Sequence, residues 1–117
     1  MIEEIKLLLG INDDLQDNLL DLLITDSEER ILSTLNSFAL KNGTEKLSTI
    51  PETLAYVKRD VIIKRFNKMN SEGATADSEE GRSYTWEKSY LDEYLPVFDE
   101  ITKPENRAVR GITRFIF

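Results

Sequence analysis

The sequence predicts an all-α fold, a small helical bundle that carries a long flexible loop and an extended C-terminal tail. Apolar residues recur at helical spacing in four stretches, glycine or proline stands at the boundaries of these stretches, and 117 residues suffice for about one domain. We therefore expect one helical domain over residues 1–106, with the loop 71–89 inside it, followed by a tail over residues 107–117.

The first two helices are expected over residues 2–9 and from about residue 13 to 40. Gly10 follows the first stretch and Gly43 follows the second. Glycine tolerates the left-handed conformation that often closes a helix. The two glycines therefore predict where these helices end.

The second helix has a recognisable start and a wide apolar stripe. Asn12 or Asp13 can cap this helix, and Gln16 stands three residues after Asp13, which is the spacing of a capping box. Ser27 is a small polar interruption of the stripe, which faces the expected core. The stripe consists of Leu15, Leu19, Leu20, Leu22, Leu23, Ile24, Ile31, Leu35 and Phe38.

A third helix is expected from Pro51, which fits a first helical turn, to about Asn70. Its apolar residues repeat at helical spacing and predict one face toward the core. Its cations predict a second, basic face that points outward. These cations are Lys58, Arg59, Lys64, Arg65 and Lys68.

The stretch after this helix predicts a mobile loop. Residues 71–80 contain no apolar residue larger than alanine, so they cannot offset the entropy that ordering costs. Residues 82–87 alternate Tyr84 and Trp86 with polar residues, which is a strand-like signal. A last short helix is expected over residues 90–101, with Pro96 in its first turn or at a kink.

Composition excludes several classes of function. The chain has no histidine and no cysteine, which excludes imidazole bases, thiolate nucleophiles, disulfides and zinc sites of the usual kind. No other metal or cofactor is expected, because helix capping explains the acidic residues near position 13 better than an ion does.

A net charge of −7 argues against a general binder of DNA or anionic membranes. Without a signal peptide or a membrane-length apolar run, we expect a soluble protein in a reducing cytoplasm.

The charge is divided into alternating blocks. Residues 1–49 and 71–106 are acidic, whereas residues 50–70 and 107–117 are basic. Such a pattern lets copies of one protein attract each other head to tail. Ordinary solvated helices give the same alternation, and from charge alone that interpretation is the more common one.

The last eleven residues mix apolar and basic side chains, which is unusual for a chain terminus. They either pack on their own domain or dock on a partner, and docking is favoured because the preceding link already closes the domain. The candidate docking residues are Arg107, Arg110, Ile112, Arg114, Phe115, Ile116 and Phe117.

Eight short stretches form a recognisable set when they are read together. They are residues 1–6, 9–11 with 13–14, 22–24, 28–32, 50–54, 63–67, 71–73 and 78–86. The most specific part is the Arg-Phe-Asn end of the basic helix followed by Ser-Glu-Gly and Ser-Glu-Glu-Gly-x-Ser. This set resembles one protein family, the head-tail connector (adaptor) proteins of long-tailed bacteriophages. The resemblance covers about residues 1–101.

The resemblance implies a structural virion protein without a catalytic centre. Members form a ring beneath the portal, expected to follow its twelve-fold symmetry, and they join the head to the stopper and tail. DNA only passes through their channel, and no cofactor or membrane takes part. The protein would be made in the cytoplasm of the bacterial host and would end in the virion.

A ring requires two complementary faces on each subunit. The basic face described above is the candidate for one side, and the candidate acidic side comprises Asp13, Asp17, Asp21 and Glu28. Candidate loop contacts to a neighbour or to the next protein of the channel are Ser71, Glu72, Gly73, Tyr84, Trp86 and Tyr90. Trp86 could equally well be a core residue or an anchor at an interface.

An alternative function uses the same basic helix differently. Residues 58–68 would let a small helical DNA-associated or regulatory protein contact nucleic acid. Five cations on one helix are commonly a solvated face, and no aromatic residues are interleaved with them for base stacking. The connector is therefore the favoured hypothesis.

Overall fold

The computed structural model describes residues 1–71, 86–87 and 89–104, and every regular element in these ranges is helical. This confirms the predicted all-α fold. The elements are α1 (Ile2–Leu9), α2 (Asp17–Asn42), a 3-10 turn η1 (Glu52–Leu54), α3 (Ala55–Ser71), α5 (Ser89–Asp92) and α6 (Leu95–Ile101). Trp86 and Glu87, the described end of the strand-like stretch, do not lie in a strand.

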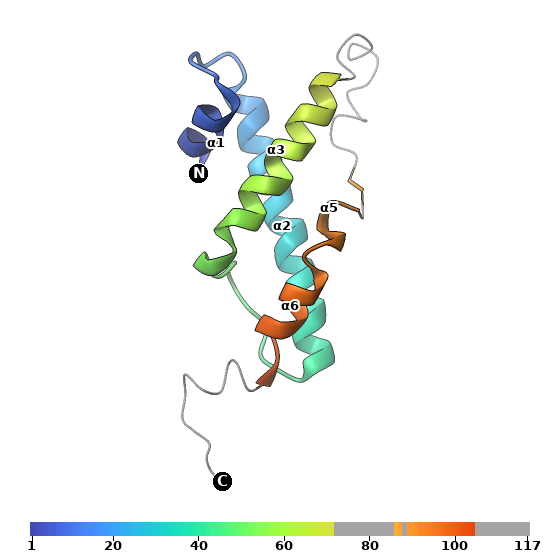
Figure 1. Cartoon of the computed structure of the whole chain (residues 1–117). Helices are drawn as coiled ribbons and strands as arrows, with labels where there is room; N and C mark the ends of the chain where they lie inside the picture. The colour runs from blue at the N-terminus through green and yellow to red at the C-terminus, as the bar shows by residue number, and fades with distance from the viewer. Residues whose placement is uncertain (72–85, 88, 105–117) are drawn as a thin grey trace.

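The long helices α2 and α3 form the body of the molecule and run in opposite directions (Figure 1). At one end α1 packs against both of them. Toward the other end α6 packs on the C-terminal part of α2, and α5 contacts α3 (Figure 1). None of the described helices combines the length and the apolar character needed to cross a bilayer.

Two glycines close helices as predicted. Gly10 has φ 75° and Gly43 has φ 72°, both in the left-handed region that residues with a Cβ rarely adopt. After Gly10, the amide of Ile11 donates to the carbonyl of Lys6 at 2.9 Å. After Gly43, the amide of Thr44 donates to the carbonyl of Ala39 at 2.9 Å. These bonds satisfy carbonyls that the last helical turns leave open.

The start of α2 differs from the prediction. The helix begins at Asp17, with Gln16 as its N-cap and no side-chain capping bond. Asp13 instead accepts a hydrogen bond from the amide of Leu15 at 3.1 Å, so it stabilises a turn before the helix. Leu15 therefore lies outside the helix and is 88% exposed. Leu22 is exposed as well, because it faces away from the buried side of α2.

One proline departs from the prediction and one agrees with it. Pro51 has ψ 145° and precedes η1, so it lies outside the helix rather than in its first turn. The expected last helix is interrupted between α5 and α6. Pro96 stands in the first turn of α6, where its missing N–H is tolerated.

The interior is divided into two apolar cores. The larger core includes Phe98 of α6 and is completed by Ile31, Leu35, Leu54, Val57, Val61, Tyr90, Leu91 and Tyr94. The smaller core lies beside α1 and consists of Ile5, Leu20, Leu23, Ile24, Ile62 and Phe66. On α2, Asp26 and Ser27 stand between the residues of the two cores, and Arg65 reaches them from α3. A polar layer thus separates two apolar ones.

Hydrogen bonds fix the end of α6 to the end of α2. The side-chain amide of Asn42 donates to the carboxylate of Asp99 at 3.1 Å and to the hydroxyl of Thr102 at 2.9 Å. The hydroxyl of Thr44 donates to the carbonyl of Thr102 at 2.8 Å. Residue 104, the last one described, therefore lies close to the C-terminal end of α2.

Candidate functional site

The predicted basic face of α3 is largely neutralised within the chain. Each of its four surface cations has a carboxylate close by, and some of these carboxylates belong to distant elements. The pairs are Lys58 with Glu28 at 3.2 Å, Arg59 with Glu4 at 3.5 Å, Lys64 with Asp60 and Glu93 at 3.0 Å each, and Lys68 with Glu87. Exposed pairs of this kind contribute little to stability, but they leave little uncompensated positive charge on α3.

Lys64 shows how these pairs connect elements. Hydrogen bonds to Glu93 and Asp60 raise the pKa of Lys64 above its ordinary value, against the opposing effect of burial. Asp60 also accepts a hydrogen bond from the hydroxyl of Tyr94. Burial and this bond together raise the pKa of Tyr94. The segment between α5 and α6 is thereby held on α3.

Arg65 does not belong to the outward face, which corrects the sequence-based expectation. Its side chain is 1% exposed, lies 2.8 Å from the carboxylate of Asp26 and donates to the hydroxyl of Ser27 at 2.9 Å. Arg30 contacts the same carboxylate at 2.9 Å. Burial disfavours the charged form of Asp26, but the hydrogen bonds from Arg30 and Arg65 outweigh it and lower the pKa of this carboxyl. Arg65 therefore connects α3 to α2 in the interior and is not part of the surface.

Trp86 stands where the chain returns to the helical body. Its ring lies 5.1 Å from the guanidinium carbon of Arg30 and 5.2 Å from that of Arg65. The ring of Tyr90 meets it edge-on, with centroids 5.2 Å apart. Trp86 is half-buried against the larger core, whereas Tyr90 is 8% exposed and belongs to that core. Of the predicted aromatic contacts, Tyr90 is thus not available to a partner.

The predicted acidic face is spread over two places. Lys6 of α1 contacts Asp17 at 2.8 Å and Asp14 at 3.1 Å, and these bonds raise its pKa. Asp21 is exposed, and Glu28 already pairs with the basic helix of its own chain. Within the described ranges no three acidic side chains gather as a metal site.

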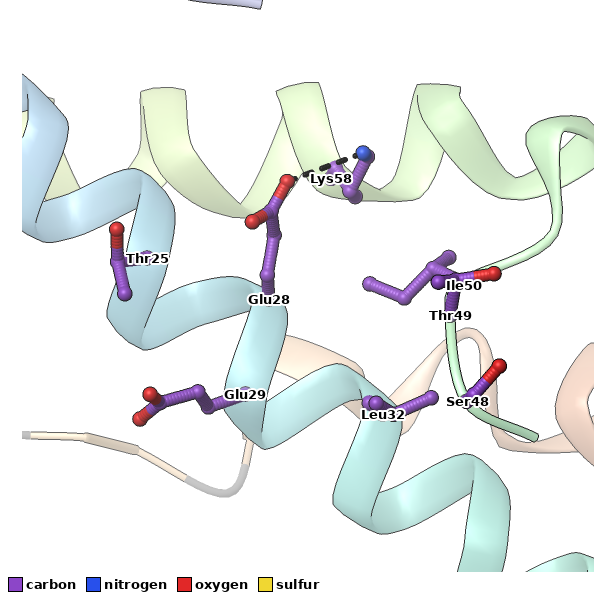
Figure 2. Close-up of a pocket in the computed structure, with 8 residues that line it drawn as sticks. All are labelled: Thr25, Glu28, Glu29, Leu32, Ser48, Thr49, Ile50 and Lys58. Carbon is purple, nitrogen blue, oxygen red and sulfur yellow. Dashed lines mark hydrogen bonds and ion pairs between the residues drawn. The ribbon is translucent and has the colours of Figure 1, made fainter. Parts of the chain in front are cut away.

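A cavity of about 330 Å³ opens beside the Glu28–Lys58 pair, between α2, the 44–50 link and the start of α3 (Figure 2). Glu28 points toward Lys58, whereas Glu29 extends away from that pair (Figure 2). The wall combines carboxylates, hydroxyls and aliphatic side chains, and its residues are Thr25, Glu28, Glu29, Leu32, Ser48, Thr49, Ile50 and Lys58. Sequence periodicity could not predict this cavity, because the link that forms one wall has no periodic pattern.

The link is held in place by one side chain of α2. The side-chain oxygen of Asn36 accepts a hydrogen bond from the amide of Leu47 at 2.7 Å, and its nitrogen donates to the carbonyl of Leu47 at 3.0 Å. This pair of bonds fixes the backbone just before the cavity wall. Asn36 is therefore a positioning residue that the sequence did not single out.

Some predicted contacts lie outside the described residues. They are Glu72, Gly73, Tyr84, Arg107, Arg110, Ile112, Arg114, Phe115, Ile116 and Phe117. Ser71 is the last residue of α3. The strongest described features are thus the Trp86 contact, the paired charges of α3 and the cavity beside Glu28.

The decisive observation comes from comparison with protein families. The family model of phage gp6-like head-tail connector proteins matches residues 1–101, which include every described helix. The chain belongs to this connector family. The family is structural rather than catalytic, and its place is in the virion, where head and tail meet. No curated protein matched the chain, and no solved structure did.

The family match and helix α6 end at the same residue. The matched range stops at Ile101, the last residue of α6, and the anchoring bonds of Thr102 follow directly. The residues beyond this point, including the basic and apolar segment 107–117, are thus not covered by the family model.

Proposed function

We propose that this connector assembles as a closed ring, twelve-fold in the virion, beneath the portal protein at the capsid vertex. In that position it extends the channel through which DNA passes and joins the head to the stopper and tail. It is made in the cytoplasm of the bacterial host and acts without a cofactor or a membrane. The observation that carries the proposal is the family match over residues 1–101.

Exposed leucines at the α1 end support assembly. Leu7, Leu8 and Leu15 are 81%, 60% and 88% exposed. Single exposed leucines are ordinary, but three at one end of so small a body provide apolar area for a neighbour. Apolar contacts of this kind supply most of the affinity between subunits, while charges at the rim set register.

The charged faces would align neighbouring subunits in this ring and add little affinity. We propose that Lys58, Arg59, Lys64 and Lys68 of one subunit approach Asp13, Asp17, Asp21 and Glu28 of the next. Most of these side chains already have partners within the chain, so exchange between subunits gains little energy. Such charges align two surfaces rather than hold them together. Arg65 takes no part, because it is buried.

Residues 71–89 and 107–117 are proposed to contact other virion proteins. The loop, through Ser71, Glu72, Gly73, Tyr84 and Trp86, contacts a neighbour or the stopper. The tail docks on the portal with an apolar anchor, Ile112, Phe115, Ile116 and Phe117, steered by Arg107, Arg110 and Arg114.

The pairing of the cations weighs against the alternative of a DNA-associated or regulatory protein. A nucleic-acid surface needs cations that can displace counterions from phosphates. The described cations of α3 instead face carboxylates of the same chain. The ten described cations also stand against seventeen described carboxylates, so the body repels DNA that passes by.

The proposal is tested by mixing purified connector with the portal protein of the same phage and measuring the mass of the assembly. We expect a discrete complex with twelve connector copies on each portal ring. If the connector fails to join the portal at any concentration, the proposal is wrong. Retention on duplex DNA that weakens steeply with salt would instead support the alternative.

A further inference from the structure

We propose that the cavity beside the Glu28–Lys58 pair receives the side chain of Arg110 from a second copy of the chain. This inference rests on the proposed function, because only an assembly of copies brings the two surfaces together. It names a specific contact that the family match does not include, since the match ends at residue 101.

The chemistry of the cavity fits a cation with an aliphatic stem. Leu32 and Ile50 provide aliphatic wall, and the hydroxyls of Ser48 and Thr49 can accept hydrogen bonds. Glu29 contacts no cation among the described residues, and Lys58 contacts only one oxygen of Glu28. A planar guanidinium with five donors matches such a set of acceptors better than an ammonium does. The volume, about 330 Å³, equals that of about eleven water molecules, enough for one long side chain.

The described body has few cations to offer a neighbour. Nine of its ten lysines and arginines lie within 4.0 Å of a carboxylate of the same chain. Within the described ranges the exception is Lys46, which lies on the link that forms the cavity wall. In the rest of the sequence, Arg82 and Lys88 are close to glutamates, whereas residues 107–117 contain three arginines and no acidic residue. This segment is therefore the best complement to the cavity.

Residues 107–117 follow a point of the chain that lies close to the 44–50 link of the cavity wall. The bonds from Asn42 and Thr44 to Thr102 hold the end of α6 at the end of α2, close to where the 44–50 link begins. From Pro104, six residues reach Arg110, which allows a span of about 20 Å. In a ring each copy offers two different faces, so the segment of one copy meets the cavity of the next. The apolar residues from Ile112 onward remain available for the portal.

The absence of cysteine makes a cross-linking test direct. Copies carrying Ser48→Cys are mixed with copies carrying Val109→Cys and treated with a short bismaleimide, both in concentrated protein alone and on the portal. Ser48 lines the cavity and Val109 precedes Arg110, so Glu29 and Arg110 are both kept. The matched control replaces the first variant by Asp21→Cys, at an exposed position of α2. We expect about tenfold more linked dimer for the 48–109 pair than for the 21–109 pair, because docking raises the local concentration of the thiols.

Each result decides the inference. A yield of 48–109 dimer equal to the control in both settings overturns it, and if rings have formed on the portal, the proposed function stands without it. Dimer at 48–109 without any portal complex supports the inference and overturns the proposed function. A double variant diluted in excess cysteine-free protein detects docking within one chain, and an internal link there overturns the choice of a second copy.

Charge reversal gives an independent readout of the same contact. Arg110→Glu should weaken self-association about fivefold, the upper range for a partly exposed ion pair. Combining it with Glu29→Arg should restore association, whereas combining it with Asp21→Arg should not. Failure of the first combination to recover would contradict a contact between these two residues.

Discussion

The guanidinium of Arg65 on α3 lies 2.8 Å from the carboxylate of Asp26 on α2, with the arginine side chain 1% exposed. This pair is the centre of the polar layer between the two apolar cores, and Arg30, Ser27 and Trp86 are arranged around it. A buried cation of this kind is stable only while its partner remains. The first prediction follows from that dependence.

Replacing Asp26 with asparagine should destabilise the connector by about 3 kcal/mol, because the substitution leaves a buried guanidinium without its counter-charge. Urea unfolding followed by circular dichroism measures the difference. Asp21→Asn, which removes an exposed carboxylate of the same helix, should change the free energy of unfolding by less than about 0.5 kcal/mol. Equal effects of the two substitutions would show that the buried pair contributes nothing.

The same pair predicts a dependence on pH. The two arginines lower the pKa of Asp26 below its ordinary value of 3.8 in the folded protein. Its contribution to stability is therefore complete above that value and is lost as the pH falls through the lower folded pKa. Between pH 7 and pH 2.5, wild-type protein should lose more stability than Asp26→Asn. Parallel curves for the two proteins would contradict the lowered pKa.

Trp86→Leu should cost about 1 to 2 kcal/mol, because leucine fills apolar space but cannot offer a ring face to Arg30 and Arg65. Unfolding must be followed by circular dichroism, since the chain has one tryptophan. Tyr56→Leu provides a comparison, as Tyr56 is 47% exposed and makes a single edge contact, with Tyr94. A cost for Trp86→Leu no larger than that for Tyr56→Leu would show that the two guanidinium contacts are without energetic effect.

Asn36→Ala should release the 44–50 link and cost about 1 to 3 kcal/mol, because the peptide group of Leu47 loses both bonds to the side chain. Hydrogen exchange should accelerate at the amide of Leu47. Ser37→Ala is the matched control, since its hydroxyl only bonds the carbonyl of Thr34 on the exposed side of α2. Unchanged exchange at Leu47 would mean that the link is held by other contacts.

Deleting residues 111–117 should leave the helix content unchanged, because helices α1, α2, α3, α5 and α6 all end by residue 101. It should abolish attachment to the portal, measured by the mass of the mixed complex. The cross-link between positions 48 and 109 should survive the deletion, which separates the two roles proposed for the tail. Loss of folding on this truncation would mean that the tail belongs to the core instead.

Sequence patterns predicted where α1 and α2 end, but not where α2 begins. Gly10 and Gly43 end helices as expected, because the left-handed conformation is a property of one or two residues. The predicted start of α2 was wrong because the Asp13 carboxylate could either cap a helix or accept a bond within a turn. In the structure it accepts a hydrogen bond from the amide of Leu15, which lies in the turn before the helix. Spacing alone cannot decide between a capping box and such a turn.

Helical periodicity could indicate that Arg65 is buried, but not which residue it contacts. It stands four residues after Val61 and three after Ile62, both buried, so its position already lay in the apolar stripe. A signal for its burial was thus present, but its partner Asp26 is 39 positions away, and helical spacing does not tell which residues of two helices meet. The cavity beside Glu28 could not be predicted either, because the 44–50 link that forms one of its walls has no periodic pattern.

The polar layer also determines how the two long helices are aligned. If α3 slid along α2 by one helical turn, about 5.4 Å, the guanidinium of Arg65 would be moved away from Asp26 and into aliphatic surroundings. The cost of an unpaired buried charge excludes that slipped arrangement, as single polar residues do in coiled coils. The layer thereby fixes the height of one helix relative to the other. In the proposed ring, identical heights would give a level rim for the next component.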